Sequence, residues 1–413
     1  MNASMAPVRI MVISDTHGAE ELPGRNELPK VDILLHCEDL TSRGRLCEYE
    51  KTLSLLASVD AELKLVIAGN HDVTLDADYW RARGPEIAGA DYSSSTAAAA
   101  MKLMRGRKAQ LSGVEFLHEG VHSFQMRSGA RFTVYASPYY PASGDGTFPH
   151  MAYRYECNQD RFNPPEKTTK YAEAIAINPI PDYPEVDIVM THTPPLGHLD
   201  QVNNGGYLGC RSLQRAIARA KPRLHCFGHV HEAYGVERIT WSGLLPDYDD
   251  EKSILCRQTL ESGESYLDVS NTARQPLQHG TDTLMVNAAM MNHENQPVQA
   301  PWIIDLELPM LRYNQDFRAK NEDGDSDPKV NVAKVKVQSE ELRRKWHSDF
   351  YVNAGWLPLT LHWSFVDDTV IPLSETWSET HTVIPLSETW VGLFGMLPGI
   401  AMLRDVWKQT REA

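Results

Sequence analysis

The chain lacks the cysteine pairs that support a disulfide framework or a thiolate metal site. Its six cysteines are scattered over 413 residues, and none of them forms a C-x-x-C pair. In a chain of this length, scattered cysteines are typical of free thiols in a reducing compartment. We therefore predict a cytoplasmic protein whose fold does not depend on disulfides.

Long apolar runs are also absent. The nearest candidate, Trp390–Leu403, is shorter than the roughly 20 residues that a spanning helix needs, and proline and glycine interrupt it. The first residues do not show the basic segment and apolar core of a secretory signal. We therefore predict no secretory leader and no membrane partner.

A basic excess is missing as well. The chain has 40 Lys and Arg against 55 Asp and Glu, which gives a formal net charge of -15. This balance argues against a nucleic-acid partner, because phosphate backbones require clustered Lys and Arg. A small anionic or phosphorylated substrate remains compatible with it, because bound metal ions can reverse the local charge.

What the sequence does contain is a series of short apolar runs, each followed by a polar cluster. Five of them are Val8–Ser14, Val31–His36, Lys64–Ala68, Val186–Met190 and Arg223–Phe227. Such runs are typical of buried strands, and the polar clusters are typical of loops at one edge of a sheet.

Helix-like stretches and further strand-like runs lie between and after these five. We predict helices at Arg45–Ala57 and Cys210–Ala220, and strands at Arg131–Ser137, Thr283–Ala289 and Trp302–Leu308. Strands that alternate with helices predict a layered α/β fold, in which ligands bind at the carboxyl ends of the strands.

The length of the chain predicts more than one part. We expect a catalytic domain over residues 1–311, with insertions near residues 158–170 and 239–280, and a C-terminal extension of unknown role over residues 312–413. The extension could be a lid, an oligomerisation element or a segment packed on the core. It contains the sequence TVIPLSETW twice, and we attach no function to this duplication.

The polar residues after the five strands form one set of metal-ligand types. They are Asp15, His17, Asp39, Asn70, His71, His192, His229 and His231. The D-x-H and H-x-H spacings place both members on one side of an extended segment. Carboxylates mixed with imidazoles suit two divalent transition metals that share a carboxylate. A single such motif is common by chance, but five motifs in order, each after a strand-like run, are not.

This series resembles the calcineurin-like metallophosphoesterases, and it is most similar to the branch related to class III cyclic-nucleotide phosphodiesterases. The segments that carry the resemblance are SDTHG, IAGNHD, THTPPLGHLD and FGHVHEAYG, and it covers roughly residues 8–308 apart from the two insertions. The resemblance implies a layered β-sandwich flanked by helices.

The resemblance also implies a centre of two divalent metal ions, which would be manganese, iron or zinc. The ligands of one ion would be Asp15, His17, Asp39 and His231, and those of the other Asp39, Asn70, His192 and His229. Asp39 would then bridge the ions, and a hydroxide between them would attack phosphorus.

Other residues of the same motifs have expected roles close to the metals. His71 could protonate the leaving oxygen or stabilise its developing charge. Asp72 is the natural partner to orient the His71 imidazole, and the alternative for Asp72 is a solvated carboxylate. Thr191 and His198 are candidates for contacts to substrate or to the metal ligands.

The pattern departs from the family at Glu38, where the family usually has glycine. Alternation along an extended segment would point this side chain away from Asp39, toward solvent or the neighbouring layer. We therefore do not count Glu38 as a ligand. If the position has a positive φ, glutamate would cost about 1 kcal/mol there.

Three functions follow from these residues. The leading hypothesis is a dinuclear-metal-dependent phosphodiesterase or phosphatase that acts on a small phosphoester. One alternative is the same centre redirected to a non-phosphate ester or amide in a biosynthetic pathway. The other is a weakly active metal-binding regulatory protein, which Glu38 would favour. The sequence does not identify the substrate.

Overall fold

The computed structural model describes residues 4–24, 28–142, 151–242, 254–260 and 265–310, together with the backbone of two later strands. The chain divides into two compact units, Met1–Gln315 and Asp316–Ala413. In the second unit, the described part is a pair of antiparallel strands, β18 (Trp363–Val366) and β19 (Thr369–Pro372). Apart from β19, the duplicated TVIPLSETW segments lie outside the described residues. The predicted boundary after residue 311 and the role of the extension stay predictions.

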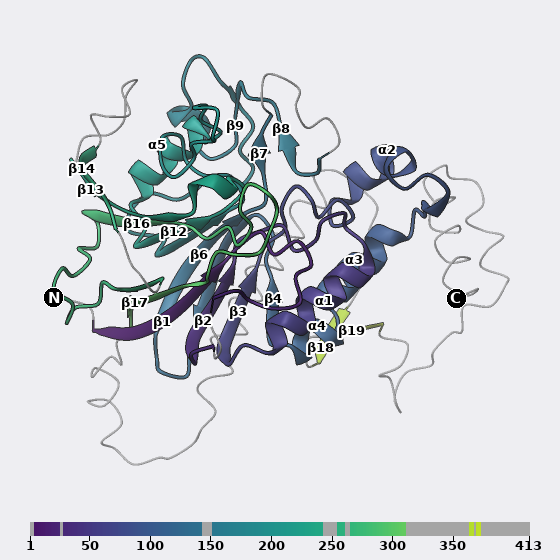
Figure 1. Cartoon of the computed structure of the whole chain (residues 1–413), viewed down its shortest axis with the longest axis horizontal. Helices are drawn as coiled ribbons and strands as arrows, with labels where there is room; N and C mark the ends of the chain where they lie inside the picture. The colour runs from purple at the N-terminus through teal and green to yellow at the C-terminus, as the bar shows by residue number, and fades with distance from the viewer. Residues whose placement is uncertain are drawn as a thin grey trace, which may run out of the picture. The chain divides into compact units, whose positions relative to one another are not determined.

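The first unit contains two mixed sheets (Figure 1). The first sheet has the strand order β15-β17-β1-β2-β3-β4. Its strands are β1 (Met5–Ile13), β2 (Val31–His36), β3 (Ala61–Val66), β4 (Val114–Phe116), β15 (Tyr266–Asp268) and β17 (Trp302–Pro309). Because β1, β2, β3 and β4 are parallel, their carboxyl ends meet at one edge of the sheet.

The second sheet has the order β14-β13-β16-β12-β11-β6-β5. Its strands are β5 (Gly120–Gln125), β6 (Arg131–Ser137), β11 (Ile188–Thr191), β12 (Leu224–Phe227), β13 (Gly235–Trp241), β14 (Ile254–Thr259) and β16 (Asp282–Asn287). The four central strands β16, β12, β11 and β6 are parallel to one another. Their carboxyl ends therefore also share one edge.

Helices cover the outer faces of the two sheets. Figure 1 shows α1, α3 and α4 beside the first sheet and α5 beside the second. The helices are α1 (Leu46–Ala57), α2 (Ala77–Ala88), α3 (Thr96–Arg105), α4 (Arg107–Leu111) and α5 (Arg211–Ala220), and the remaining short strands are β7 (Tyr140–Pro141), β8 (Arg154–Tyr155), β9 (Gln159–Asp160) and β10 (Glu173–Ala174). Among the described residues, no helix combines the length and the apolar character that a membrane crossing needs.

Alternation along β1 explains this layering. Val8, Ile10 and Val12 are buried in the core that also contains residues of the second sheet. Met11 and Ile13 face the other way, into a core shared with α1. Because side chains alternate along a strand, one apolar strand can fill both layers. The interior of the molecule is therefore the sheet-to-sheet core, with a helix-covered core on each side.

The structure confirms the predicted layered sandwich flanked by helices. All eight predicted strands are present, and β2 and β6 have the predicted bounds. Two features differ from the sequence predictions. The helices α2, α3 and α4 were not predicted, and the stretch over residues 239–280 is not simply an insertion, since it contains the end of β13, the whole of β14 and β15.

Candidate metal centre

The loops after β1 and β2 run side by side at the carboxyl edge of the first sheet. The backbone N–H of Asp15 donates to the carbonyl of Glu38 over 3.2 Å, and that of His17 donates to the carbonyl of Asp39 over 2.9 Å. These hydrogen bonds fix the two loops relative to each other. The D-x-H motif and the second-strand aspartate are thus brought together as the sequence predicted.

Four of the predicted ligands have a left-handed backbone conformation. The φ angles of Asp15, His17, Asp39 and His229 are 53°, 46°, 43° and 67°. Such angles are uncommon for residues other than glycine, and each costs of order 1 kcal/mol or more, so they cluster where function requires a particular side-chain direction. Here they turn the side chains out of the strand direction and into one cluster.

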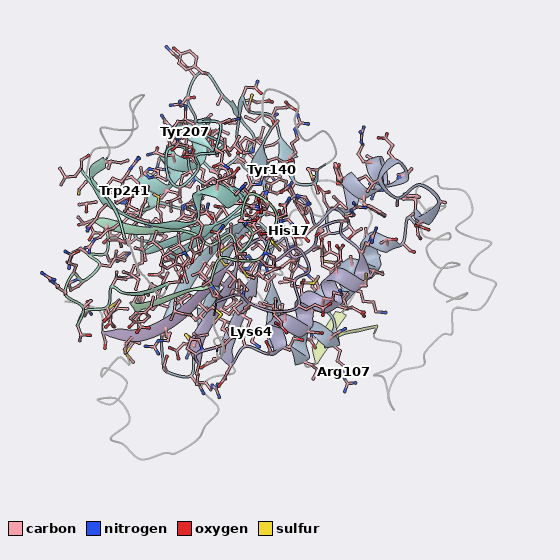
Figure 2. All side chains as sticks on the ribbon, viewed as in Figure 1. His17, Lys64, Arg107, Tyr140, Tyr207 and Trp241 are labelled. Atoms are coloured by element: carbon pink, nitrogen blue, oxygen red, sulfur yellow. The ribbon has the colours of Figure 1, made fainter. Side chains whose placement is uncertain are left out.

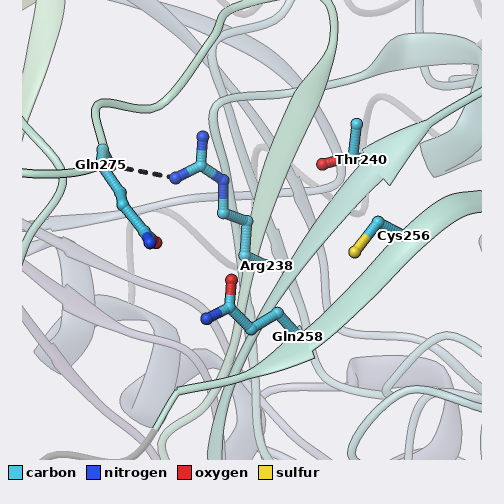
Figure 3. Close-up of a pocket in the computed structure, with 5 residues that line it drawn as sticks. All are labelled: Arg238, Thr240, Cys256, Gln258 and Gln275. Atoms are coloured by element: carbon cyan, nitrogen blue, oxygen red, sulfur yellow. Dashed lines mark hydrogen bonds between the residues drawn. The ribbon is translucent and has the colours of Figure 1, made fainter.

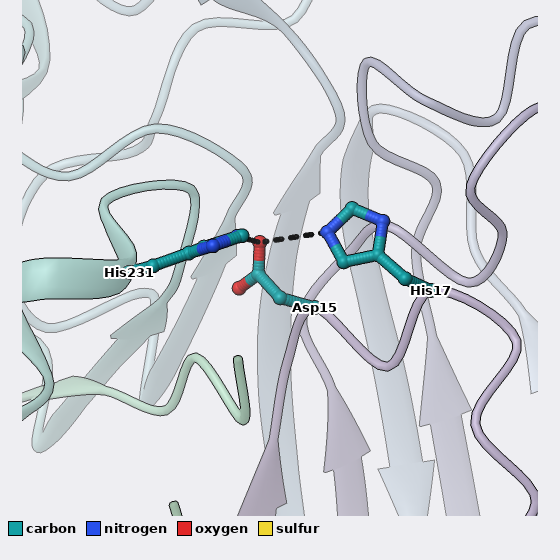
Figure 4. A group of neighbouring side chains, drawn as sticks. All are labelled: Asp15, His17 and His231. Atoms are coloured by element: carbon teal, nitrogen blue, oxygen red, sulfur yellow. Dashed lines mark hydrogen bonds and ion pairs between the residues drawn. The ribbon is translucent and has the colours of Figure 1, made fainter. Parts of the chain in front are cut away.

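One group of the cluster consists of Asp15, His17 and His231 (Figure 4). The Asp15 carboxylate lies between the two rings, with Oδ1 at 3.1 Å from Nε2 of His231 and 4.0 Å from Nε2 of His17. Nδ1 of His17 lies 3.2 Å from the carbonyl of Thr41, which can only accept a hydrogen bond. Nδ1 of His17 therefore carries the proton, and Nε2 is the basic nitrogen that faces the carboxylates.

Asp39 lies next to this group. Its Oδ2 is 3.9 Å from Nε2 of His17, and its Oδ1 accepts a hydrogen bond of 2.9 Å from the backbone N–H of His71. A side chain at Gly69 would collide with the Asp39 carboxylate. The glycine of the GNHD motif therefore allows the loop after β3 to approach Asp39 closely.

Asn70, His192 and His229 bring the later motifs to the same place. The ring centroids of His192 and His229 are 4.4 Å apart, and the backbone N–H of His229 donates to Oδ2 of Asp15 over 3.2 Å. Asn70 is buried in the loop that also places His71 against Asp39. The structure therefore collects the predicted residues of both sheets in one cluster.

Burial keeps most of these imidazoles neutral. It lowers the pKa of His17 to about 3, with the neighbouring His71 adding to the effect, and it lowers the pKa of His229 to about 4. Burial and the adjacent His229 hold the pKa of His192 well below its usual range. Neutral imidazole is the form that binds a metal ion. The exception is His231, where burial is outweighed by the Asp15 carboxylate and the pKa rises to about 9.

The carboxylates and several polar atoms of the cluster lack partners that would compensate for their burial. Burial raises the pKa of Asp39 well above its usual range, and the negative charges of Asp15 and Asp72 raise it further. Within the described chain, His17 Nε2, Asn70 Oδ1 and His192 Nε2 are buried without a hydrogen-bond partner. Buried charges and orphaned polar atoms are costly unless they are paired. The carboxylates and imidazoles form overlapping groups of three, each with ligand atoms within 4.8 Å of one another, and this donor set fits divalent metal ions.

His71 has a different partner from the one that we expected. Its Nδ1 lies 2.9 Å from the carbonyl of Ser42. The carboxylate of Asp72 instead accepts hydrogen bonds from the backbone N–H groups of Leu40, Thr41 and Gly69, at 3.1, 3.0 and 2.9 Å. The expectation that Asp72 orients the His71 imidazole is therefore corrected: Asp72 joins the loops that carry Asp39 and Asn70.

Thr191 and His198 are both buried, and each already has a partner inside the protein. Thr191 Oγ1 donates to the carbonyl of Thr193 over 2.8 Å and lies 2.8 Å from Nε2 of His225. His198 Nδ1 lies 3.1 Å from a carboxylate oxygen of Glu237. Contacts of these two residues with a substrate stay predictions.

Tyr140 is a residue of the site that sequence reasoning missed. Its ring centroid lies 5.3 Å from those of both His192 and His229, and Figure 2 shows it in the same part of the molecule as His17. The Tyr140 hydroxyl is buried and has no hydrogen-bond partner in the described part of the chain. Burial raises its pKa above the usual range, so the phenol keeps its proton. No motif marks this tyrosine, because its place depends on the path of the chain after β6.

Glu38 also lies in the site, contrary to expectation. It is fully buried, its Oε2 lies against Nδ1 of His192, and one carboxylate oxygen lies within 4.8 Å of those of Asp15 and Asp39. Side-chain alternation holds only for an extended backbone, and the φ of 43° at Asp39 ends it. The left-handed residue is thus Asp39 and not Glu38, so the predicted backbone cost at Glu38 does not apply.

A separate pocket of about 380 Å³ lies on the second sheet and is lined by polar residues of β13, β14 and a later loop (Figure 3). These residues are Arg238, Thr240, Cys256, Gln258 and Gln275. The Arg238 guanidinium donates to the carbonyls of Gln275 and Pro276, at 3.0 and 2.7 Å, and pairs with Asp282. Its charge is therefore already neutralised, and the pocket does not extend the metal centre.

Comparison with known proteins agrees with this geometry. The profile of a family described as Calcineurin-like phosphoesterase matches residues 8–233. The chain is 33% identical over 236 residues to the Probable rhamnogalacturonate lyase C of Emericella nidulans, which covers 57% of this chain and 18% of the relative. It is 32% identical over 233 residues to a UPF0046 protein of Caenorhabditis elegans, covering 55% and 52%. The matched segments thus span about half or less of the length of these two relatives.

Two further comparisons cover more of the chain. Human Metallophosphoesterase domain-containing protein 1 is 28% identical over 303 residues, covering 73% of this chain and 72% of the relative. Among solved structures, the purple acid phosphatase PPD1 from yellow lupin gives a TM-score of 0.30 at 12% identity, covering 74% of this chain and 54% of that one. Since the family profile spans more than half of the 413 residues, the chain belongs to the calcineurin-like phosphoesterase family.

Proposed function

We propose that the protein is a metal-dependent phosphodiesterase or phosphatase that acts on a small phosphoester. One observation carries this proposal. Five strands from two sheets deliver buried carboxylates and neutral imidazoles to one place, where the described chain offers no Lys or Arg side chain to balance them. Such a cluster requires cations from outside, and family membership makes divalent metal ions the natural choice.

The proposed ligands are those of the family motifs. One ion is held by Asp15, His17, Asp39 and His231, and the other by Asp39, Asn70, His192 and His229. The first set includes the orphaned Nε2 of His17, and the second the orphaned Asn70 Oδ1 and His192 Nε2. The Asp15 carboxylate stabilises the proton on His231, and binding of a metal ion to this nitrogen would release it. Manganese, iron and zinc all suit this donor set.

When bound, a pair of divalent ions lowers the pKa of water and neutralises charge on a phosphoryl group. The protein contributes a proton carrier, His71. Because the Ser42 carbonyl holds Nδ1 of His71, its Nε2 is free to hold or give up a proton at the leaving oxygen of the substrate. The rings of His71 and His17 are nearly perpendicular, with centroids 4.8 Å apart, so the His71 imidazole lies close to the centre.

Asp72 and Tyr140 support the centre without binding metal. The backbone hydrogen bonds of Asp72 fix the spacing between the loops that carry Asp39 and Asn70. Tyr140 covers His192 and His229 and excludes water from one side of them. The proposal includes a small anionic substrate and a cytoplasmic location, while oligomerisation through the extension stays a prediction.

A substrate screen tests the proposal. Protein loaded with manganese, cobalt, nickel or zinc is assayed with bis-p-nitrophenyl phosphate, cyclic nucleotides and a p-nitrophenyl ester. We expect turnover of at least one phosphoester and its loss after chelation. Hydrolysis of the carboxylic ester alone would favour the alternative of a redirected centre. If no phosphoester is cleaved with any of the metals, the proposal is wrong.

A further inference from the structure

The buried carboxylate of Glu38 has a defined set of contacts inside the site. The hydroxyl of Ser14 donates to Oε1 over 3.3 Å, and Oε2 lies against Nδ1 of His192. Both partners are fully buried. A buried carboxylate must be paired or hydrogen-bonded. Glu38 lies between Ser14 and His192, so a group that can donate faces each of its carboxylate oxygens.

The fold leaves room for this side chain. A Cβ at Gly228, the glycine of the GHVH motif, would lie 2.5 Å from Oε1 of Glu38 and would collide with Asp15 and Ser14. Gly228 follows β12 in the second sheet, whereas Glu38 follows β2 in the first. The carboxylate therefore crosses the gap between the sheets and reaches His192 at the end of β11.

The contact decides which nitrogen of His192 carries the proton. A neutral imidazole has one N–H and one lone pair, and a carboxylate can only accept. A histidine that binds a metal ion does so as neutral imidazole. The proton therefore belongs on Nδ1, where Oε2 of Glu38 accepts it. This leaves the lone pair on Nε2, which is buried without a hydrogen-bond partner among the described residues, whereas Nδ1 lies against Glu38.

We propose that Glu38 is a positioning residue that accepts a hydrogen bond from Nδ1–H of His192 and so presents Nε2 to a metal ion. The inference rests on the proposed metal centre and deepens it. Histidine ligands that donate their second N–H to a carboxylate have a fixed ring orientation and a more basic nitrogen. Ser14 holds the other carboxylate oxygen and keeps the glutamate in place.

Direct coordination by Glu38 is the competing arrangement. Oxygens of Asp15, Glu38 and Asp39 lie within 4.8 Å of one another, so a third carboxylate is near enough to be considered. The hydrogen-bonded arrangement is favoured because each oxygen of Glu38 already faces a group of the protein that can donate, the Ser14 hydroxyl at Oε1 and Nδ1 of His192 at Oε2.

Two substitutions separate these arrangements. Glu38→Gly introduces the residue that the family usually has, and removes the acceptor. Glu38→Gln keeps a side-chain carbonyl that can accept from Nδ1–H but removes the negative charge. For wild type and both variants, Co²⁺ affinity is measured by competition with a chelating dye. The exchangeable Nδ1–H proton of His192 is followed by NMR in the Co²⁺-loaded protein, and circular dichroism checks folding.

We expect the wild type and Glu38→Gln to show a protected His192 Nδ1–H signal and similar Co²⁺ affinities. In Glu38→Gly, this proton should exchange rapidly, and the affinity should fall about 10- to 100-fold, as is typical when the partner of a ligating histidine is removed. Unchanged affinity and an unchanged proton signal in Glu38→Gly would overturn the proposal. An equal loss of affinity in both variants, with an altered Co²⁺ absorption spectrum, would overturn it in favour of direct coordination.

Neither readout depends on turnover, so this inference and the proposed function can fail separately. If the wild type binds Co²⁺ with the protected signal but cleaves no phosphoester, the inference holds and the proposed function is wrong. If the wild type cleaves phosphoesters and Glu38→Gly binds Co²⁺ as tightly as the wild type does, the proposed function holds and the inference about Glu38 is wrong. A wild type that binds no metal at all would contradict both.

Discussion

The strands β11 and β12 have buried polar residues at both ends. The buried carboxylates at the two ends of these strands have different partners. At the amino ends, Arg223 Nε donates to Oδ1 of Asp187 over 3.2 Å, and Thr133 N–H donates to the other oxygen over 3.0 Å. At the carboxyl ends, His192 and His229 face the carboxylates of the metal centre. The same two strands thus carry a closed ion pair at one end and an incomplete charge cluster at the other.

The neighbouring strand β16 repeats the amino-end pattern. Asp282, at its first position, accepts from Thr240 Oγ1 over 2.8 Å and from the backbone N–H of Gln278 over 3.0 Å, and it pairs with Arg238. An arginine within the chain meets each buried carboxylate at these amino ends. The carboxylates of the metal centre have only histidines, backbone groups and hydroxyls among their described partners. The difference indicates that one end is built for stability and the other for cations that the chain does not supply.

The largest expected effect comes from Asp39→Asn. Asparagine cannot supply a shared carboxylate, so both metal sites should lose occupancy, and turnover should fall to background, a loss on the order of 10⁶-fold if the acceleration is typical of enzymes. Metal content is measured by mass spectrometry alongside the phosphoester assay. Asp187→Asn is the matched control at the other end of the molecule and should keep its metals. Equal metal content in Asp39→Asn and wild type would refute the bridging role.

The next largest effect is expected for His71→Ala. The backbone N–H of residue 71 donates to Asp39, and alanine preserves this hydrogen bond. The imidazole, which contacts the carbonyl of Ser42, is lost. Turnover should fall about 10²- to 10⁴-fold, the usual contribution of a general acid or base, with both metals still bound. Substrates with a good leaving group, such as p-nitrophenol, should show the smallest loss. A rate equal to that of wild type would remove His71 from the chemistry.

Removal of the metal ions should lower the free energy of unfolding only by the binding energy lost at the carboxyl-end cluster. Ions at 100 times their dissociation constant stabilise the folded state by about 2.7 kcal/mol for one site, and chelation removes this gain. The free energy of unfolding is measured with and without chelator in wild type and in Arg223→Met. We expect the same metal-dependent increment in both, because distant sites contribute additively. A smaller increment in Arg223→Met would show that the two ends are coupled.

Arg223→Met should itself lower the free energy of unfolding by about 2 kcal/mol, since hydrogen bonds to a buried charged group are lost. The loss should be the same with and without metals. Lys30→Met is the control, because Lys30 and Asp60 form an ion pair of 3.5 Å that is mostly exposed to solvent, and such pairs contribute about 0–1 kcal/mol. Comparable losses in the two variants would argue against a structural role for the Asp187–Arg223 pair.

Much of this arrangement could be predicted from the sequence. The ligands follow apolar strands directly, and β2 and β6 begin and end where the pattern places them. Ligand identity is readable because it depends on chemistry at a strand terminus. The arginine partners of Asp187 and Asp282 cannot be predicted in the same way, because each arginine comes from another segment of the chain that lies close only in the folded sheet.

The directions of side chains in the loops were beyond sequence reasoning. Alternation placed Glu38 away from Asp39, but the left-handed φ of Asp39 cancels the alternation. Asp72 follows His71 directly, yet its carboxylate bonds to backbone groups of other loops. In each case a backbone turn that no local pattern encodes decides the contact. The sequence therefore predicts which residues meet, and the structure is needed to show how they meet.

The smallest expected effect concerns pH and the amino-end cluster. Arg223 donates to Nδ1 of His279 over 2.9 Å, Asp187 contributes an opposing charge, and the Tyr183 ring centroid lies 5.0 Å from that of His279. Burial, reinforced by the charge of Arg223, lowers the pKa of His279 to about 4, compared with about 6.5 in an unfolded chain. Protonation would place a hydrogen on Nδ1, where it would face the donor N–H of the guanidinium.

Because the pKa of His279 is lower in the folded state, the unfolded state binds the proton first as the pH falls. The stabilising contribution of neutral His279 is therefore fully present above pH 6.5 and is lost as the pH falls toward about 4. Glutamine can accept from Arg223 but does not titrate, so His279→Gln should lose less stability than wild type over this interval. Unfolding curves for both proteins are compared across it in the presence of chelator, which keeps metal release from the other end out of the measurement. Parallel pH profiles would show that the pKa of His279 does not change on folding. The difference between the amino-end and carboxyl-end clusters would then be supported only by the ion pairs of Asp187 and Asp282 with arginine.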